Sequence, residues 1–390
     1  MSCYISSNNE RIYVALESTY GDVPTITASN RIPLVKLTAK QVPAQTNRSD
    51  KTGSRTFVGL PNTIRKTTNY SLNTLLTEWT DQTTAPSEGP LFQAAMGGTP
   101  VFYNGGTVAT VTGQTEIQFT APHGLSAGQA VTFSGEMRFV VAIADSTTVF
   151  LNAPFNNIPQ AGSTFGTTIT YVLAESLPSV SIFDYWDPAG SVQRIIDGAA
   201  VDTMTVKVNG DFQEFDFAGP AEDLLDSASF TSGEGDLSAF PAEPSLTGFD
   251  YTIVPGHLGE VWMGATPTQF FTLTSATLTL ENDVELRARE FGSDFARCIA
   301  AGERKVTLNF ELFELVDAQT PALYQAARQR SPISVMLQLG EQTNQLFGAY
   351  MPAMVPEVPE FDDSETRLQW KFHNSRAQGT VGNELYIAFG

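Results

Sequence analysis

The sequence is poor in the residues that catalysis and covalent cross-linking most often use. Of its 390 residues only two are cysteine and three are histidine. Cys3 and Cys298 are too few for the disulfide framework of a small secreted domain, so a reducing compartment is the simpler expectation. No histidine stands near another His, Cys or acid at metal-ligand spacing, and no phosphate loop or nucleophile motif occurs. We therefore expect no metal, no cofactor and no active site.

Long apolar runs and positive charge are also scarce. No run approaches the ~18 apolar residues that a membrane helix needs, and the first residues show neither the basic nor the apolar part of a signal peptide. We expect no membrane span and no signal-peptide secretion. Lys and Arg number 22 against 42 Asp and Glu, a net charge of −20. The 42% apolar content is ample for folded cores, and the length allows two or three domains.

The charges are unevenly spread. Residues 211–250 hold ten acids and no Lys or Arg, whereas residues 36–66 hold seven Lys or Arg and one acid. Twelve of the chain's 22 Lys and Arg residues lie in 36–66 and 285–305. Two interpretations stay open: a solvated acidic surface with basic loops, or two complementary contact faces that orient a partner.

One segment occurs twice in the chain. LFQAAMGGTPV (91–101) matches LYQAARQRSPI (323–333), with five identities among eleven positions. Upstream, 68–76 matches 308–316, with Asn69 opposite Asn309. The spacing changes by eight residues across the following loop, as it does when surface loops differ in length. These matches predict a duplicated domain, because the period is far too long for a solenoid.

Alternating apolar and polar residues predict a mainly β fold. The segment 204–217 reads as a hairpin turning at Asn209-Gly210, and 305–315 and 367–373 read as strands with one apolar face. We expect helices only at about 88–97 and 317–330, with a short one near 220–227. Each repeat should therefore be a β-sandwich or curled sheet with one flanking helix.

The domain division follows from the duplication. Residues 1–105 with 170–235 form domain 1, and residues 246–390 form domain 2. Residues 106–169 have no partner in the second repeat and carry their own short-strand pattern, which predicts a small inserted β domain. Residues 236–245, in a stretch rich in Gly, Ser and Pro, read as the linker. We expect the insert to project outward and to be dispensable for assembly.

Both repeats resemble a known family. The opening YVALESTYGDVP (13–24), then a strand, then a long polar hairpin running into RKTTNYSL (65–72), resembles the major tail tube proteins of long-tailed bacteriophages. Residues 275–313 resemble them more clearly, and the helix 321–328 follows where that family carries its single helix. The resemblance excludes the segment 107–168. It implies two tail-tube-like β-sandwich domains whose sheets join those of neighbours to close a ring around a channel.

The resemblance also implies a function. The chain would be a structural virion protein and not an enzyme, present in the virion tail and, during assembly, in the host cytoplasm. Its implied partners are other copies of itself, the tape measure protein, the tail terminator and baseplate proteins, while DNA passes through the lumen without specific binding. Because most of the family builds each ring from six one-domain copies, a duplicated chain would need three.

The channel wall should be polar and not basic, because Lys and Arg bind phosphates and would stall DNA. The polar residues that alternate with apolar ones along the expected strands are candidates for lining the lumen: Asn69, Ser71, Asn73, Glu214, Asp216, Asn309 and Glu311. An equally simple alternative is that they are ordinary solvent-facing positions.

Two long basic loops are candidates for contacts between rings. Both exceed the two to five residues usual for hairpins. Their candidate contact residues are Arg48, Lys51, Arg55, Arg65, Lys66, Arg287, Arg289, Arg297 and Arg304, which we expect to lie against the acids of 211–250 and 357–365 on the next ring. Three other functions stay open: a distal tail or baseplate ring protein, a β-rich adhesion module, and an enzyme with a scattered site.

Overall fold

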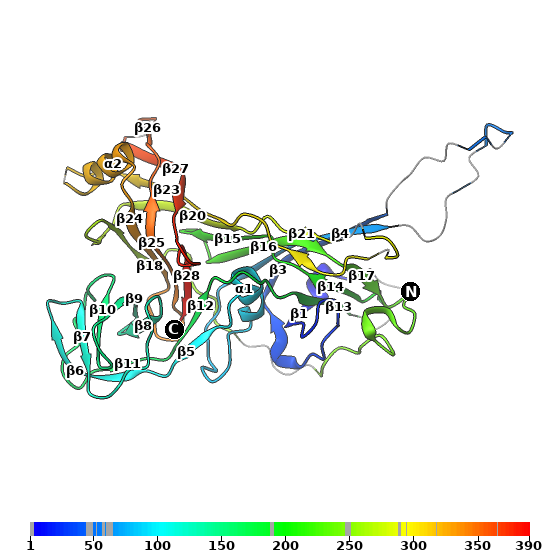
Figure 1. The fold of residues 1–390 in the computed structure, drawn as a ribbon, viewed down its shortest axis with the longest axis horizontal. Helices are drawn as coiled ribbons and strands as arrows, with labels where there is room; N and C mark the ends of the chain where they lie inside the picture. Colours follow the sequence, from blue (N-terminus) through cyan, green and yellow to red (C-terminus); the bar gives the residue numbers. More distant parts are fainter. Residues whose placement is uncertain are drawn as a thin grey trace.

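The computed structural model describes residues 4–43, 50–51, 53–56, 59, 65–187, 191–245, 251–287, 290–293, 295–316, 318–364 and 366–390. Over these residues the protein is mainly β, as predicted, with two α-helices and several sheets. Figure 1 shows an elongated molecule with the N-terminus at one end and α2 (Gln319–Gln329) near the other.

The elements of the first half are β1 (Glu10–Leu16), β2 (Arg31–Ile32), β3 (Leu34–Pro43), β4 (Lys66–Leu75), α1 (Gly89–Met96), β13 (Val180–Trp186), β14 (Arg194–Ala199), β15 (Thr203–Val208), β16 (Glu214–Ala221) and β17 (Asp223–Asp226). Three-residue 3-10 turns lie at Ser7–Asn9, Ala28–Asn30 and Glu234–Asp236. The predicted hairpin 204–217 is present as β15 and β16, and Asn209 takes the positive φ of 68° in its turn.

The second half consists of β18 (Gly259–Gly264), β19 (Thr268–Gln269), β20 (Leu273–Glu281), β21 (Glu285–Leu286), β22 (Ile299–Ala300), β23 (Lys305–Phe313), α2, β24 (Ile333–Leu339), β25 (Phe347–Val355), β26 (Glu360–Asp362), β27 (Gln369–Ala377) and β28 (Tyr386–Phe389). Both expected long helices are therefore present, each a residue or two shorter than predicted at either end.

The two halves pair their strands in the same order. The first half has β17-β14-β13-β1-β2 in one sheet and β15-β16-β4-β3 in the other. The second half has β28-β25-β24-β18-β19 and β26-β27-β23-β20. Each strand has a counterpart at the same place in this order, so we call the halves repeat 1 and repeat 2. Repeat 2 adds a short pairing of β25 with β27.

An aromatic contact fixes which residues correspond. Phe92 of α1 meets Phe217 of β16 with ring centroids 5.2 Å apart and planes at 87°. Tyr324 of α2 meets Trp370 of β27 at the same 5.2 Å and 87°. Since Phe92 and Tyr324 correspond in the repeated sequence, Phe217 and Trp370 are counterparts as well.

The prediction of a short helix near 220–227 is wrong. β16 continues to Ala221, and β17 occupies Asp223–Asp226, paired along its length with β14. Leu225 is buried against the outer face of that sheet. Pairing with β14 and burial of Leu225 outweigh the helix propensity of this Ala-, Leu- and acid-rich segment, because propensity is a weak term beside tertiary contacts.

One pair of strands joins the repeats. β15 of repeat 1 pairs antiparallel with β20 of repeat 2, from Thr203 opposite Glu281 to Val208 opposite Ala276. The result is an eight-stranded run, β3-β4-β16-β15-β20-β23-β27-β26. Its apolar face packs into a core shared by both repeats, as a sheet with alternating residues does when one side is buried.

The second sheet of each repeat carries an apolar row on its outer face. The row runs through directly opposed residues, which are Tyr13, Phe183, Ile195 and Leu225 in repeat 1 and Trp262, Met336, Tyr350 and Tyr386 in repeat 2. In repeat 1 the row is covered by Leu237 and Phe240, so the expected linker packs on the sheet. In repeat 2 it is covered by the insert.

The insert has its own sheet and core. Its strands are β6 (Gly106–Thr112), β7 (Glu116–Phe119), β8 (Ala130–Phe133), β9 (Glu136–Ile143), β10 (Thr148–Leu151) and β11 (Thr164–Phe165). Phe155 and Phe165 are core residues, and Phe150 is half-buried. The flanking strands β5 (Val101–Tyr103) and β12 (Thr168–Val172) pair with each other, and β12 also pairs with β28 of repeat 2.

The insert docks closely on repeat 2, at the lower left of Figure 1. Phe139 of β9 stacks on Tyr350 of β25 at 5.2 Å and 20°. Gln338 of β24 accepts from the Met137 amide at 2.6 Å and donates to the Gly135 carbonyl at 3.0 Å. Gly128 lies so near Tyr386 that a Cβ there would be 2.1 Å from its ring.

Arg138 is the charged centre of this contact. Its side chain is fully buried between Glu136 at 2.5 Å and Glu260 of β18 at 3.1 Å. Its guanidinium also lies over the rings of Phe155 and Trp262. A buried guanidinium is tolerated only when its donors are satisfied, so Glu260 and the insert depend on each other. That the insert is dispensable for assembly stays a prediction.

We predict that Phe139→Ala destabilises the protein by roughly 3–5 kcal/mol, the cost of emptying a buried aromatic site. Val141→Ala, an exposed position on the same strand, should change stability by less than about 0.5 kcal/mol. Urea unfolding measures both. Equal and small effects would mean that the insert contributes nothing through this contact.

Candidate assembly surfaces

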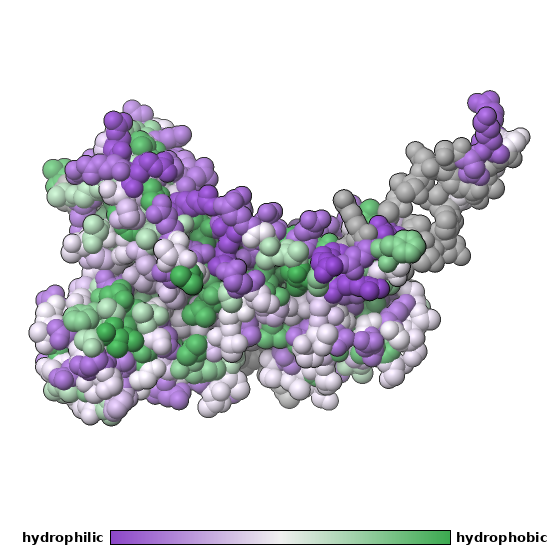
Figure 2. Space-filling view, viewed as in Figure 1, coloured by the Kyte–Doolittle hydropathy of each residue, from purple (hydrophilic) through white to green (hydrophobic). Residues whose placement is uncertain are grey.

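The seven residues predicted for a channel wall all lie on one face of the eight-stranded sheet. They alternate along β4, β16 and β23 with buried residues such as Leu72, Phe217 and Phe310. Asn73 stands opposite Asp216 and donates to it at 2.6 Å, and Asn309 stands opposite Thr277. In Figure 2, hydrophilic surface follows the upper margin of the molecule, where Figure 1 labels β26, β20, β15 and β4.

Two lysines on this face are paired with acids, whereas Lys36 and Lys40 of β3 stand opposite Asn73 and Asn69. Lys207 of β15 lies 2.7 Å from Asp216 and 3.3 Å from Glu214. Lys371 of β27 lies 2.6 Å from Asp362, and it stands opposite Glu311. The Lys371 ammonium holds the pKa of the Asp362 carboxyl well below its ordinary range. The sequence analysis named Glu214, Asp216 and Glu311 for the wall and placed Asp362 among the acids expected to meet the basic loops, but it did not foresee the lysines beside them.

The eight-stranded sheet is open at both ends. β3 pairs only with β4, and β26 pairs only with β27, within the described part of the chain. Exposed apolar side chains lie along both edges, including Val35 and Val42 on β3 and Phe361 on β26. An exposed strand edge is a template for pairing with another chain.

The two basic loops meet at their bases. Arg65 donates to the Glu290 carbonyl at 3.1 Å, and the Lys66 ammonium lies 5.8 Å from the centre of the Phe295 ring. The described tip of the first loop, including the exposed Lys51 and Arg55, lies far from the body at the upper right of Figure 1.

The other basic candidates differ among themselves. Arg287 pairs with Glu290, and Arg297 is exposed. Arg304 is held inside the molecule, since it lies 3.0 Å from Glu384 and donates to the Ala174 carbonyl at 2.7 Å. This position makes Arg304 a link between segments of one chain. Arg48 and Arg289 lie outside the described residues.

The acids of 211–250 do not form one surface. Glu214 and Asp216 lie on the polar sheet face, and Glu243 lies 2.5 Å from Arg11. Asp223 directly faces Asp197 across β17 and β14. The expectation of a single acidic surface along this stretch is therefore wrong, because alternate strand residues and a folded-back linker send the carboxylates to separate places.

A cavity of about 520 Å3 collects several carboxyl groups, among them Asp22, Asp197, Glu222, Asp223 and Asp236. Asp197 is almost fully buried, and its Oδ1 has no hydrogen-bond partner among the described residues. Burial first, and then the neighbouring charges of Asp223 and Glu222, raise the pKa of Asp197 to about 8. Burial likewise raises the pKa of Glu222 to about 7. Phe295 from the loop of repeat 2 lines the same cavity.

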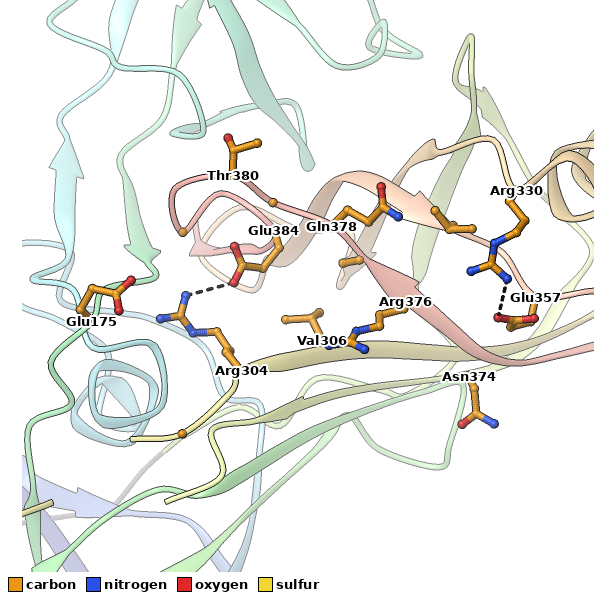
Figure 3. A pocket seen from close by; sticks show the side chains of 15 residues that line it. Glu175, Arg304, Val306, Arg330, Glu357, Asn374, Arg376, Gln378, Thr380 and Glu384 are labelled. Carbon is orange, nitrogen blue, oxygen red and sulfur yellow. Dashed lines mark hydrogen bonds and ion pairs between the residues drawn. The ribbon is translucent and has the colours of Figure 1, made fainter. Parts of the chain in front are cut away.

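A second cavity, of about 850 Å3, opens beside β23 and β27 (Figure 3). Figure 3 shows Arg304 directed at Glu384, 3.0 Å apart, and Arg330 directed at Glu357, 3.8 Å apart. A third lining arginine, Arg376, lies 2.7 Å from Glu303. The guanidinium groups of this cavity are therefore already matched with carboxylates.

No cluster of three or more His, Cys, Asp or Glu side chains in the described part of the chain is placed to hold a metal ion. Neither helix in that part is long and apolar enough to cross a membrane. The sequence matches no protein-family model and no curated protein sequence.

We predict that stability falls as the pH rises from about 4 to about 8. Between those values the unfolded chain has released the proton of Asp197, whose ordinary pKa is 3.8, while the folded chain still holds it. Ionising the group thus favours unfolding over this window. Glu10 and Glu88, with pKa values raised by burial to about 7, act in the same direction.

The variant Asp197→Asn should raise the melting temperature at pH 8 by at least about 2 °C and leave it nearly unchanged at pH 4. Asp211→Asn, at an exposed position, is the matched control and should change neither value. Parallel melting curves at both pH values measure this. A loss of stability at pH 8 in Asp197→Asn would contradict the buried, protonated carboxyl.

Proposed function

We propose that the chain is the major tail tube subunit of a long-tailed bacteriophage, a structural protein that polymerises as stacked rings around a channel for DNA. The observation that carries this proposal is the β15–β20 pairing, which joins two copies of one unit into a single sheet. The same strand pairing between chains would extend the sheet from one chain to the next. A heterologous contact of this kind, repeated around an axis, closes a ring. Three chains then supply six units.

The free edges match the internal junction. β26 is the counterpart of β15, and β3 is the counterpart of β20, so the edge of one chain fits the opposite edge of the next. At the internal junction Met204 is 0% exposed, while its counterpart Phe361 is 58% exposed. Because Met204 is buried and its apolar counterpart Phe361 is exposed, we infer that a neighbouring chain covers Phe361.

The register of the β15–β20 pairing predicts the register between β26 of one chain and β3 of the next. Thr205 and Asp362 are counterparts, since they stand opposite the equivalent residues Asp216 and Gln369. Val42 of β3 is the counterpart of Thr279, which faces Thr205. The proposed contact therefore sets Asp362 opposite Val42. Asp362 then lies on the diagonal from Lys40, an arrangement in which opposite charges attract across strands.

The polar sheet face forms the channel wall in this proposal. Two of its lysines have carboxylate neighbours within the chain, Asp216 for Lys207 and Asp362 for Lys371, while Lys40 of β3 meets Asp362 of the next chain in the proposed register. Because unpaired cations on the wall would bind phosphates, such pairing suits a surface that DNA must slide past. Other implied partners are the tape measure protein, the tail terminator and baseplate proteins, in the virion tail and, before that, in the host cytoplasm.

Negative-stain images of the purified protein test the proposal. We expect rings and tubes with an open centre and sixfold appearance. Rings that never stack into tubes would favour a distal tail or baseplate ring protein. Single particles at every concentration would contradict both and favour the adhesion module.

We also predict that reversing Arg48, Lys51 and Arg55 to Glu leaves the subunit folded and the rings intact but impairs tube growth. The described tip of this loop projects from the body, so Lys51 and Arg55 are placed to reach another ring. Single exposed pairs contribute only about 0–1 kcal/mol, yet many identical contacts in a tube add up. Tubes of wild-type length from the variant, at low and high salt, would show that these charges do not set stacking.

A further inference from the structure

The segments that precede the two repeats are built alike. The amide of Asn9 donates to the Ser6 carbonyl at 3.1 Å, and the amide of Leu258 donates to the Pro255 carbonyl at 3.4 Å. Each turn leads into the first strand of its repeat, in the register set by Tyr13 and its counterpart Trp262. The turns are preceded by apolar pairs, which are Tyr4-Ile5 in repeat 1 and Ile253-Val254 in repeat 2.

In repeat 2 this apolar pair is docked on repeat 1. Ile253 forms a bridge with Thr77, just after β4, and Val254 donates to the Leu76 carbonyl at 3.1 Å. Val254 is 0% exposed and Leu76 is 1% exposed. A short antiparallel contact between the leading segment of one repeat and the segment after β4 of the other therefore seals the junction beside β15 and β20.

The counterparts of Val254 and Leu76 are exposed to solvent. Ile5, the counterpart of Val254, is 48% exposed, and Tyr4 beside it is fully exposed. Val316 corresponds to Leu76 in the register that pairs Asn69 with Asn309, and it is fully exposed. Val316 lines an apolar groove of about 560 Å3 together with Leu315, Ala318, Leu368 and Glu314.

We propose that Tyr4-Ile5 of one chain occupies the Leu315–Val316 groove of the next copy, opposite Val316 as Val254 is opposite Leu76. This inference rests on the proposed ring. The occupant cannot be the same chain's own segment, because Figure 1 places the N-terminus and α2, beside the groove, at opposite ends of the molecule. The direction also agrees with the sheet edges, since the repeat that offers β26 also offers the groove.

The docked pair acts as a clasp between chains. Sheet pairing at β26 is short, with three residues in the strand, whereas the internal β15–β20 pairing spans six. A second contact beside a short sheet junction adds apolar burial where the edge alone offers little. Chains that lack the clasp should therefore form rings far less readily, although each chain folds.

Site-directed disulfide cross-linking tests this contact. In a Cys3→Ser, Cys298→Ser background, one chain carries Ile5→Cys and a second, of different tag length, carries Val316→Cys. Oxidation of the mixed, assembled protein should give a disulfide-linked pair of the two chains and no pair of identical chains. Leu76→Cys with Val254→Cys in one chain is the matched control and should form a disulfide within that chain, since directly opposed strand residues lie within disulfide reach.

A second pair of variants removes any dependence on the cysteines. Val316→Asp should abolish rings in negative-stain images, at least a tenfold loss in particle count, while the melting curve stays that of the parent. Val381→Asp, at a similarly exposed valine outside the groove, should leave ring number unchanged.

The outcomes separate the clasp from the ring itself. Rings that form without the Ile5–Val316 cross-link, while the internal control cross-links, overturn the clasp and leave the proposed function standing. Normal rings from Val316→Asp do the same. Protein that stays monomeric in every variant and in the parent overturns both proposals.

Discussion

The antiparallel pairing of β15 with β20 is the contact on which the rest of the molecule depends. It turns two separate four-stranded sheets into one and brings the helix of repeat 1 against repeat 2. Phe92 of α1 packs on Phe347 and Phe389 of repeat 2 as well as on its own repeat. Asn282, which follows β20, donates to the Ala95 carbonyl at the end of α1 at 2.9 Å. Sheet, helix and core therefore form one cooperative unit.

The same contact makes the two repeats unequal. Six residues of α1 are buried, whereas three residues of the longer α2 are. The difference has a simple cause, because α1 has a neighbouring repeat to cover it and α2 has none. Met204 and Val254 are buried at the internal junction, whereas their counterparts Phe361 and Ile5 are exposed. These exposed counterparts mark the surface that a further copy would cover.

The sequence predicted well what local residue patterns determine. The alternation of apolar and polar residues predicted the mainly β fold and placed Asn73 and Asp216 on one face. The repeated segment predicted both helices. Prediction from the sequence failed where distant segments decide the outcome. The helix near 220–227 is a strand because β14 pairs with it. The insert docks on repeat 2 through Arg138, and Arg304 is an internal link. Arg138, a lone arginine among apolar residues of the strand 136–143, is a sequence signal for the docking of the insert.

Amide hydrogen exchange along the edge strand tests the central claim most directly. In the separate chain, the outward amides of β3 have no strand partner among the described residues, while those of β20 are paired with β15 on one side and β23 on the other. The account predicts that, on assembly, exchange slows at the Val42 end of the peptide 34–43, which faces β26, while exchange of 273–281 stays unchanged. Exchange at that end of 34–43 as rapid in assembled particles as in the separate chain would contradict the claim that the internal junction is repeated between chains.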